Sequence, residues 1–208
     1  MSAKPNGSAA APPWLLLVGG APGSGKTQLA RQLATRYGAP LCTKDTLKEI
    51  LFDTLGTAPP EPASEVARWS RRLSDASFAL MFHVASLLLP AQRCVLLEGN
   101  FRPGEHEAPL AALLAGSGAR LIQILCHARP ATRAARLAAR AGDPTRHPGH
   151  RDAHIDVQLP EPGFLVLRGL RLGFDSDAAC DRALATLCRE LDARLAPGRR
   201  QTPPQPSR

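Results

Sequence analysis

One segment of eight residues restricts what this chain can fold into more than any other feature. It spans residues 20–27, reads GAPGSGKT and fits the P-loop pattern G-x-x-x-x-G-K-[ST]. An apolar run at residues 15–18 precedes it, and a helical pattern at residues 28–37 follows it. Glycines let successive backbone N–H groups turn towards an anion, and the helix adds the positive end of its dipole. The segment predicts a strand, a phosphate-binding loop and a helix; a glycine-rich turn without a ligand is the alternative.

The side chains of this loop predict a site for ATP or GTP together with Mg²⁺. Lys26 can reach the β- and γ-phosphate oxygens, and the hydroxyl of Thr27 can bind the metal. The other loop residues expected to contact the nucleotide are Gly20, Pro22, Gly23, Ser24 and Gly25.

Length and composition favour a single globular domain. A chain of 208 residues, of which 44% are hydrophobic, can bury one sizeable α/β core and hardly two. The formal charge of +8 suits an anionic ligand such as a phosphorylated metabolite or a nucleic acid, but an Arg-rich and Ala-rich composition can also be a genomic habit. We weigh these two interpretations equally.

The cysteines and the apolar runs indicate a cytoplasmic protein. The five cysteines form no C-x-x-C pair, and Cys42, Cys94 and Cys126 fall in apolar strand patterns, so we expect buried, reduced thiols. No apolar run approaches the roughly 20 residues that span a bilayer, and the run at residues 15–17 is too short for a signal peptide. We therefore expect no membrane partner.

Strand and helix patterns alternate along most of the chain, as they do in an α/β fold with a parallel sheet and helices on both faces. We expect a folded domain at residues 13–196 and disordered tails at residues 1–12 and 197–208, where small, polar and proline residues dominate. Strands are expected at residues 14–18, 41–42, 94–97, 121–126 and 170–174. Helices are expected at residues 28–37, 46–55, 64–89, 109–114, 131–140 and 178–195, with Ser64 as the N-cap of the third.

The stretch after the second expected strand supplies a candidate base. Asp45 follows this strand at its carboxyl end, where open α/β sheets bind their ligands, and its carboxylate could accept the proton of an attacking hydroxyl. The alternative is that Asp45 is only the N-cap of the next helix. Lys48, one helical turn later, would point the same way and could hold an anionic group of the substrate. Glu49 is interpreted as a solvated helix charge.

Glu98 ends the expected strand at residues 94–97 and is a second candidate carboxylate. It is placed to bind Mg²⁺ through water or to meet a substrate hydroxyl. Asn100 and Arg102 follow it and are candidate substrate ligands, or loop residues with no role. The strand lacks the Asp-Glu pair of mechanical ATPases of the AAA+ type, and this difference favours phosphoryl transfer to a substrate over ATP-driven work.

A series of arginines follows the fourth expected strand. Arg136 and Arg140 are four residues apart on one helix face, so both could converge on one anion and neutralise charge on a transferring phosphoryl group. A solvated basic face is the alternative. The full series is Arg129, Arg133, Arg136, Arg140 and Arg146.

The aperiodic segment at residues 142–162 contains RHPGH at residues 146–150. His147 and His150, with Asp152 and His154 beyond them, invite a zinc site, but no four-ligand spacing completes it. We prefer an anion- or substrate-binding loop that includes Arg146, His147 and His150.

Taken together, these motifs resemble a bacterial family of small P-loop kinase-like proteins, which are usually labelled AAA-family ATPases, zeta-toxin-like or polynucleotide-kinase-like proteins. The resemblance covers residues 14–195 and implies the nucleoside-monophosphate-kinase type of P-loop fold, with a five-stranded parallel sheet and an Arg-bearing lid at about residues 130–160. The motifs that carry it are the P-loop, KDTLKE at residues 44–49, EGNF at residues 98–101, Arg136-x-x-x-Arg140 and RHPGH.

The resemblance also implies roles for individual residues. Asp45 corresponds to the aspartate that activates the acceptor hydroxyl in polynucleotide 5′-kinases and chloramphenicol phosphotransferases. Arg136 and Arg140 correspond to lid arginines, and Ser176, in the FDSD stretch, to the loop beside the nucleotide base. Polynucleotide kinases commonly have Arg where this chain has Lys48 and Asp where it has Glu98, so nucleic acid is allowed as a partner but is not the favoured acceptor.

The sequence therefore predicts an ATP- and Mg²⁺-dependent phosphotransferase acting on a hydroxyl of a small molecule or nucleotide. Two alternatives stay open: a polynucleotide 5′-hydroxyl kinase, and a toxin-like regulator or nucleotide switch that binds ATP without productive transfer. Asp45 discriminates between transfer and switching, because a pure switch needs no base beside an acceptor.

Overall fold

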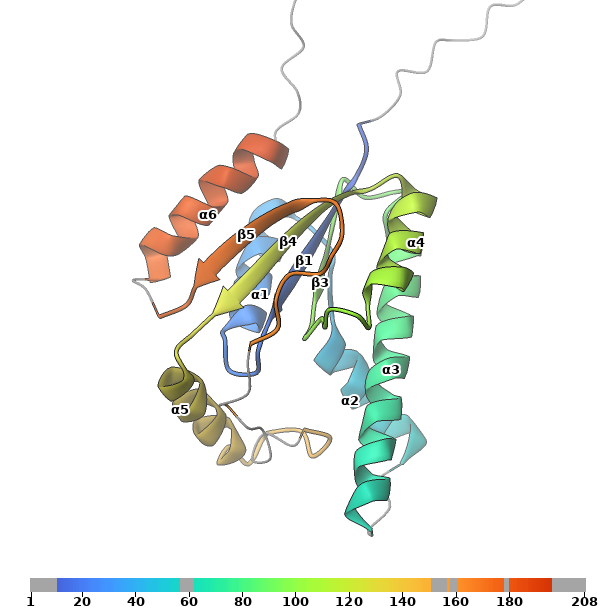
Figure 1. Cartoon of the computed structure of the whole chain (residues 1–208), viewed down its shortest axis with the longest axis vertical. Coiled ribbons are helices and arrows are strands. Elements are labelled where there is room, and N and C mark those ends of the chain that lie inside the picture. The colour runs from blue at the N-terminus through green and yellow to red at the C-terminus, as the bar shows by residue number, and fades with distance from the viewer. Residues whose placement is uncertain (1–10, 57–61, 151–156, 158–160, 178–179, 196–208) are drawn as a thin grey trace, which may run out of the picture.

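The computed structural model describes residues 11–56, 62–150, 157, 161–177 and 180–195. Five parallel strands form one sheet in the order β2-β3-β1-β4-β5, with helices on both faces, which confirms the predicted α/β fold class (Figure 1). The strands are β1 (Trp14–Gly20), β2 (Leu41–Thr43), β3 (Cys94–Glu98), β4 (Arg120–His127) and β5 (Leu170–Asp175). The helices are α1 (Lys26–Tyr37), α2 (Lys44–Leu55), α3 (Ala63–Leu88), α4 (Glu107–Ser117), α5 (Pro130–Ala141) and α6 (Cys180–Leu195).

Alternation along the strands divides the core between the two faces of the sheet. On β1, Leu16 and Val18 pack with the apolar sides of α1 and α6, whereas Leu15 and Leu17 pack with those of α3 and α4. Because successive strand residues point to opposite faces, a strand that is buried on both sides is apolar at every position. Helices α2 and α5 lie beyond the carboxyl ends of the strands (Figure 1).

The parallel register brings three segments to the same edge of the sheet. Val18 on β1 lies opposite Glu98 on β3, and Glu98 lies opposite Thr43 on β2. The residues that follow these three positions along the chain therefore begin side by side, at the edge where open α/β sheets bind ligands.

The starts of α2 and α3 are among those that differ from the prediction, and their caps show the reason. Helix α2 begins at Lys44, and its N-cap is Thr43, whose Oγ1 accepts a hydrogen bond from the N–H of Thr46 (3.3 Å). Helix α3 begins at Ala63 with Pro62 at the N-cap, so Ser64 as N-cap is wrong. The carbonyl of Pro62 accepts from the N–H of Glu65 (2.9 Å), which starts the helical pattern before Ser64 can cap it.

The predicted state of the cysteines is confirmed where the structure describes them. Cys42, Cys94, Cys126 and Cys188 are free thiols; Cys94, Cys126 and Cys188 are buried as predicted, whereas Cys42 is only half-buried. Burial raises the pKa of Cys94 to about 11 and that of Cys126 to about 12, so both are inert thiols at neutral pH.

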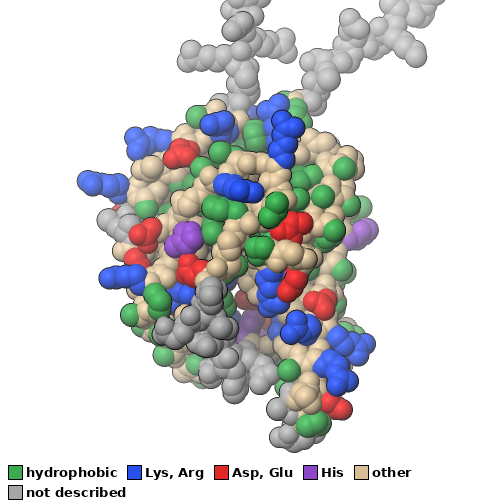
Figure 2. Space-filling view, in the orientation of Figure 1, with side chains coloured by type: hydrophobic (Ala, Val, Ile, Leu, Met, Phe, Trp, Pro, Cys, Tyr) green, Lys and Arg blue, Asp and Glu red, His purple; other side chains and the backbone are tan. Residues whose placement is uncertain are grey.

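Two features of the described residues concern the partners predicted from the sequence: the distribution of charge on the surface and the apolarity of the helices. On the face shown in Figure 2, Lys and Arg side chains are dispersed among acidic ones. No helix in the described ranges is both long enough and apolar enough to cross a bilayer. The predicted tails lie outside the described residues, except for positions 11–12. Residues 151–156 and 158–160 of the predicted lid also lie outside them.

Gly20 should be required for stability, whereas Gly116 should not. Gly20 has φ of +143°, and a Cβ there would lie 2.5 Å from the carbonyl oxygen of Cys126; a Cβ on Gly116, inside α4, would meet nothing within 4 Å. We expect Gly20→Ala to cost about 2–3 kcal/mol and to lower Tm by roughly 4–12 °C, and Gly116→Ala to leave Tm unchanged or raise it by a few degrees. Thermal unfolding monitored by circular dichroism tests this, and equal Tm values for the two variants would contradict it.

Candidate active site

The phosphate-binding loop joins β1 to α1 in a conformation that needs glycine. Gly23 (φ +80°) and Gly25 (φ +84°) are in the left-handed region, and Gly25 is the N-cap of α1. The loop packs directly on α5, because a Cβ on Gly23 would lie 2.9 Å from the carbonyl oxygen of Arg133. Lys26 then begins the helix.

Two arginines of α5 hold the carbonyl groups of this loop. Arg133 donates from Nε to the carbonyl of Pro22 (3.2 Å), and Arg136 donates to the carbonyl of Gly23 (3.1 Å). In a trans peptide the C=O and the following N–H point in opposite directions. The carbonyl of Pro22, held towards α5, therefore turns the N–H of Gly23 away from it, as a phosphate cradle requires. The N–H of Ser24 donates to the carbonyl of Ala21 (3.1 Å) and closes a turn within the loop.

Arg133 is a site residue that the sequence analysis noted only as one of the arginine series. It is 3% exposed and forms an ion pair with Glu161 (3.3 Å), whose other carboxylate oxygen lies 2.8 Å from His127 Nδ1. Its position three residues before Arg136 was the one available signal. Glu161 lies in an aperiodic segment and had none.

The structure separates the two arginines that were expected to share one anion. The Arg136 guanidinium lies against the loop and Ser176, donating to Ser176 Oγ (2.8 Å) and to its carbonyl oxygen (3.2 Å). Ser176 thereby lies beside Gly25, whose Cβ would come within 3.2 Å of the serine Cβ. Arg140, one turn further along α5, lines the pocket described next.

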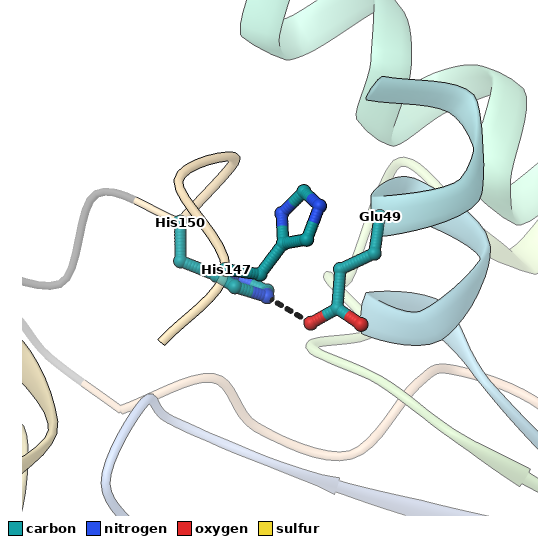
Figure 3. A group of neighbouring side chains, drawn as sticks. All are labelled: Glu49, His147 and His150. Atoms are coloured by element: carbon teal, nitrogen blue, oxygen red, sulfur yellow. Dashed lines mark hydrogen bonds and ion pairs between the residues drawn. The ribbon is translucent and has the colours of Figure 1, made fainter. Parts of the chain in front are cut away.

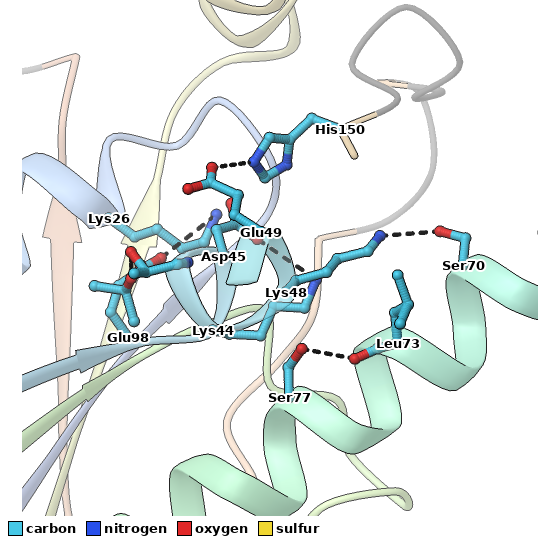
Figure 4. A network of polar contacts seen from close by, with 12 residues as sticks. Lys26, Lys44, Asp45, Lys48, Glu49, Ser70, Leu73, Ser77, Glu98 and His150 are labelled. Carbon is cyan, nitrogen blue, oxygen red and sulfur yellow. Dashed lines mark hydrogen bonds and ion pairs between the residues drawn. The ribbon is translucent and has the colours of Figure 1, made fainter. Parts of the chain in front are cut away.

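A pocket of about 290 Å³ lies at the carboxyl edge of the sheet and collects most of the predicted substrate residues (Figure 4). A larger hollow of about 720 Å³ lies between β5 and α6, and none of the predicted site residues is among its lining residues. The pocket at the sheet edge is lined by Pro22, Lys26, Lys44, Asp45, Lys48, Ser70, Ser74, Gly99, Asn100, Arg102, Arg140 and His150.

Glu98 is a buried carboxylate that suits a metal ion. It is 1% exposed, and neither of its oxygens has a hydrogen-bond partner in the described part of the chain. Lys26 Nζ lies 4.0 Å from Oε1. Burial raises the pKa of Glu98, and the charge of Lys26 opposes this shift. With the hydroxyl of Thr27, this oxygen donor fits the hard-ligand preference of Mg²⁺.

Asp45 lies in the first turn of α2, where it lines the pocket rather than capping the helix. Since Thr43 is the N-cap, the interpretation of Asp45 as a cap is excluded. Lys44 Nζ lies 3.4 Å from the Asp45 carboxylate, whose side chain is 43% exposed. Burial acts to raise the pKa of Asp45, but the charges of Lys44, Lys26 and His150 lower it overall. The carboxylate is therefore ionised and able to accept a proton.

Helix α3 and the loop after β3 complete the wall of the pocket. Lys48 is 8% exposed and donates from Nζ to Ser70 Oγ (2.9 Å) (Figure 4). Arg102 pairs with Glu105 (3.2 Å) at the surface, and its backbone N–H donates to the buried ring of His106 (2.9 Å). This ring packs against Phe78, with ring centroids 4.0 Å apart, and holds the loop that carries Asn100 and Arg102.

The RHPGH segment lies against α2 through two histidine–carboxylate pairs. His150 Nε2 is 2.5 Å from Glu49 Oε1, and His147 Nε2 is 3.0 Å from Asp53 Oδ1. Of the three residues expected to bind substrate here, His150 lines the pocket, while His147 and Arg146 lie in the preceding turn. Glu49 was interpreted as a solvated charge, and the structure instead gives it His150 as a partner.

Glu49, His147 and His150 also form a group that could hold a metal ion, since one ligand atom from each lies within 4.8 Å of the others (Figure 3). In this arrangement, however, both ring nitrogens of His147 already have partners, because Nδ1 accepts from the N–H of Gly149 (3.0 Å) and Nε2 contacts Asp53. The group therefore serves to hold the segment on α2.

Comparison with known proteins places the chain in a family. Residues 15–159 match the family model described as an AAA domain. The chain belongs to this family. Its P-loop implies nucleotide binding, and the domain is kinase-like in fold.

Relatives and solved structures extend the comparison. An uncharacterized protein of Mycobacterium tuberculosis, Rv2004c, is 31% identical over 144 residues, which are 69% of this chain and 28% of that protein. A crystal structure from Chloroflexus aurantiacus, described as a "putative kinase", is 28% identical with a TM-score of 0.75, covering 86% of this chain and 98% of that one. A sugar kinase from Janibacter sp. shares the fold at 14% identity and a TM-score of 0.51, covering 88% and 95%.

Removing the Arg133 guanidinium should weaken nucleotide binding. Arg133→Ala deletes the donor that orients the Pro22 carbonyl, and we expect the Kd for a non-hydrolysable ATP analogue to rise about 10-fold, the worth of one such hydrogen bond. Arg189→Ala, an exposed change on α6, is the control and should bind as the wild type does. Calorimetric titration well below each Tm gives the answer; unchanged affinity in Arg133→Ala would show that the loop keeps its shape without this contact.

Proposed function

We propose that this protein is an ATP- and Mg²⁺-dependent phosphotransferase that moves the γ-phosphate to a hydroxyl of a small molecule or nucleotide. The observation that carries the proposal is the convergence on one pocket edge of Lys26, the buried Glu98 and the ionised Asp45. The likeness to the Chloroflexus structure described as a kinase supports it.

The residues divide the work in the following way. The loop N–H groups and Lys26 bind the phosphates, while Thr27 and Glu98 would hold Mg²⁺, which supplies charge neutralisation at the phosphate oxygens when bound. Asp45 accepts the proton of the acceptor hydroxyl while the oxygen of that hydroxyl bonds to the γ-phosphorus. The bond between the γ-phosphorus and the oxygen that bridges to the β-phosphate breaks at the same time, and ADP leaves. Arg140, and Arg136 after a movement away from Ser176, stabilise the charge on the transferring group.

The two alternatives make different demands on the site. A nucleotide switch needs no carboxylate beside an acceptor pocket, so the position of Asp45 favours transfer. A polynucleotide 5′-hydroxyl kinase needs a basic track for the strand, and on the face shown in Figure 2 acidic side chains lie among the cations. Small molecules and nucleotides are therefore the preferred acceptors.

The test is a screen for transfer of γ-labelled phosphate from ATP. Sugars, nucleosides, nucleotides, antibiotics and 5′-hydroxyl oligonucleotides are offered to the wild-type protein and to Lys26→Ala, which removes the phosphate contact. Labelled product with the wild type and none with Lys26→Ala supports the proposal. Saturable ATP binding without transfer to any member of the panel favours the switch instead.

Asp45→Asn should lower kcat by roughly 10²–10⁴, the usual contribution of a general base, with ATP affinity little changed. The amide keeps the size of the side chain but cannot take the proton. Asp75→Asn on α3 is the matched control, because Asp75 is exposed and does not line the pocket. Steady-state kinetics with the acceptor found in the screen measure kcat for each variant. A kcat of Asp45→Asn equal to that of the wild type would show that Asp45 is not the general base.

We further propose that α5 and the segment from residue 142 to 162 form a lid over bound ATP. The proposed lid contacts both sides of the pocket. Its helix α5 contacts the P-loop through Arg136. The segment after α5 contacts α2 through the two histidine–carboxylate pairs. Water excluded by a lid cannot hydrolyse ATP.

Hydrogen exchange should report this closure. We expect exchange at residues 130–160 to slow when Mg²⁺ and a non-hydrolysable ATP analogue are added, and Arg136→Ala and Arg140→Ala to depress kcat more than ATP affinity. Peptides of α6 serve as the internal control. Equal exchange with and without the nucleotide, together with normal kcat in both variants, would leave the segment as an ordinary helix and loop.

A further inference from the structure

The last strand of the sheet, β5, offers an edge to a further strand. Among the described strands β5 pairs with β4 alone, at one end of the sheet (Figure 1). A strand at such an edge directs part of its N–H and C=O groups to the side without a neighbour, where another strand can pair with them. The hollow of about 720 Å³ beside α6 is lined by every residue from 171 to 175. Because successive side chains point to opposite faces of the sheet, a hollow that touches all five runs along the edge of the strand.

The exposed side chains of β5 suit antiparallel pairing with a second copy of the same strand. Arg171 and Asp175 are exposed and lie two positions before and two positions after Gly173. In an antiparallel pair centred on Gly173, Arg171 of each copy lies directly opposite Asp175 of the other copy. Opposite charges at such positions attract, whereas like charges there repel. A Cβ on Gly173 would meet nothing within 4 Å, so this part of the edge is open to a second backbone.

The contacts that these two side chains make within the chain are compatible with this pairing. Arg171 donates from one terminal nitrogen to the carbonyl of Leu165 (3.1 Å), and a guanidinium has five N–H donors. The Asp175 carboxylate accepts from the N–H of Asp177 (2.9 Å) through Oδ1, and a carboxylate accepts up to about four hydrogen bonds. Each group can therefore meet an opposite charge on a second copy without losing its present contact.

Helix α6 has the same symmetry of charge beside the strand. Arg182, Thr186 and Glu190 are spaced four residues apart, so they share one helix face, and all three are exposed and line the same hollow. Arg182 and Glu190 are equally far from Thr186 and carry opposite charges. Two copies of α6 that run antiparallel and meet at Thr186 would place Arg182 of each copy near Glu190 of the other.

The centres of symmetry on the strand and on the helix lie at a similar level. Helix α6 runs back along β5 from the end at which the strand finishes (Figure 1). Gly173 is about 7 Å before the last residue of β5, at the usual rise of a strand. Thr186 is about 9 Å beyond the first residue of α6, at the usual rise of a helix. One two-fold axis can therefore pass close to both residues.

We propose that this protein forms a two-fold symmetric dimer in which β5 pairs antiparallel with β5 of a second copy about Gly173, and α6 packs beside α6 of that copy about Thr186. The two five-stranded sheets then become one continuous sheet. Such an interface uses the same surface on both copies, so each favourable charge pair occurs twice. Charges of one sign along β5 would instead have protected the edge from self-pairing. The proposal does not depend on the reaction at the other edge of the strands.

Sedimentation velocity over a range of protein concentrations tests the strand contact. We expect the full chain to form a concentration-dependent dimer. Gly173→Glu places two carboxylates opposite each other at the axis and should raise the dimer Kd by about 10- to 100-fold. Gly116→Glu on α4 is the matched control, because Gly116 is also exposed and also has open space at its Cβ, and it should dimerise as the wild type does. Far-UV circular dichroism checks that both variants are folded.

A charge exchange tests the helix contact. Arg182→Glu alone opposes carboxylates at both helix pairs of the dimer, and Glu190→Arg alone opposes guanidinium groups there, so each should raise Kd by about 10- to 100-fold. The double variant should dimerise as the wild type does. An equimolar mixture of the two single variants should also form dimers, because every pair between unlike copies then joins opposite charges. Misfolding of either variant would prevent this recovery and cannot imitate it.

The outcomes separate this dimer from other uses of the edge. Loss of the dimer in Gly173→Glu and its recovery in the mixture support the proposal. A dimer that is unaffected by Gly173→Glu forms through another surface and overturns it, and so does a wild-type protein that is monomeric at every concentration. For such a monomer, hydrogen exchange identifies the occupant: slow exchange in β5 would indicate a segment of this chain along the edge, and fast exchange an edge left for a different protein.

Discussion

The parallel pairing of β2, β3 and β1 is the constraint on which the rest of the site depends. Thr43, Glu98 and Val18 lie in one row across the sheet, so the start of α2, the loop after β3 and the P-loop leave the sheet at one edge. No flexible segment has to bring Asp45, Glu98 and Lys26 together, because backbone hydrogen bonds of the sheet already do so. A change of register by one residue would turn Glu98 to the other face of the sheet and remove it from Lys26.

The fold and this central part of the site could be predicted because their signals are local. Apolar strands and 3.6-residue periodicity lie within short windows, and the P-loop is a contiguous motif. The placement of Asp45 and Glu98 needed one more step, that strand ends in a parallel sheet share an edge. The predicted helix boundaries were less accurate. Ser64 has a side chain that commonly caps helices, yet Pro62 is the N-cap of α3, and its backbone carbonyl accepts the first hydrogen bond, from the N–H of Glu65.

The outer part of the site could not be predicted because its contacts join distant segments without a pattern. His150 and Glu49 are 101 residues apart, and Arg133 meets Pro22 from 111 residues away. Helical spacing suggested that Arg136 and Arg140 face the same anion, but four residues also separate them by about 6 Å along the helix axis. This rise puts Arg136 beside the P-loop and Ser176, and Arg140 beside the pocket.

The two carboxylates of the site are shifted in opposite directions, and the shifts indicate what each group would receive. The pKa of Glu98 is raised, mainly by burial, so the stability that its neutral form contributes at low pH is lost as pH rises through that folded-state pKa. The pKa of Asp45 is lowered overall despite burial, because of the Lys44 and Lys26 charges, so its contribution is present above the ordinary Asp pKa and is lost as pH falls through the folded-state value. Burial thus disfavours the charged form of Glu98, whereas the neighbouring cations favour the charged form of Asp45. A divalent cation bound beside Glu98 would stabilise its charged form, and the phosphates of a bound nucleotide would meet the cations that lower the pKa of Asp45, so each shift suits one ligand of the proposed reaction.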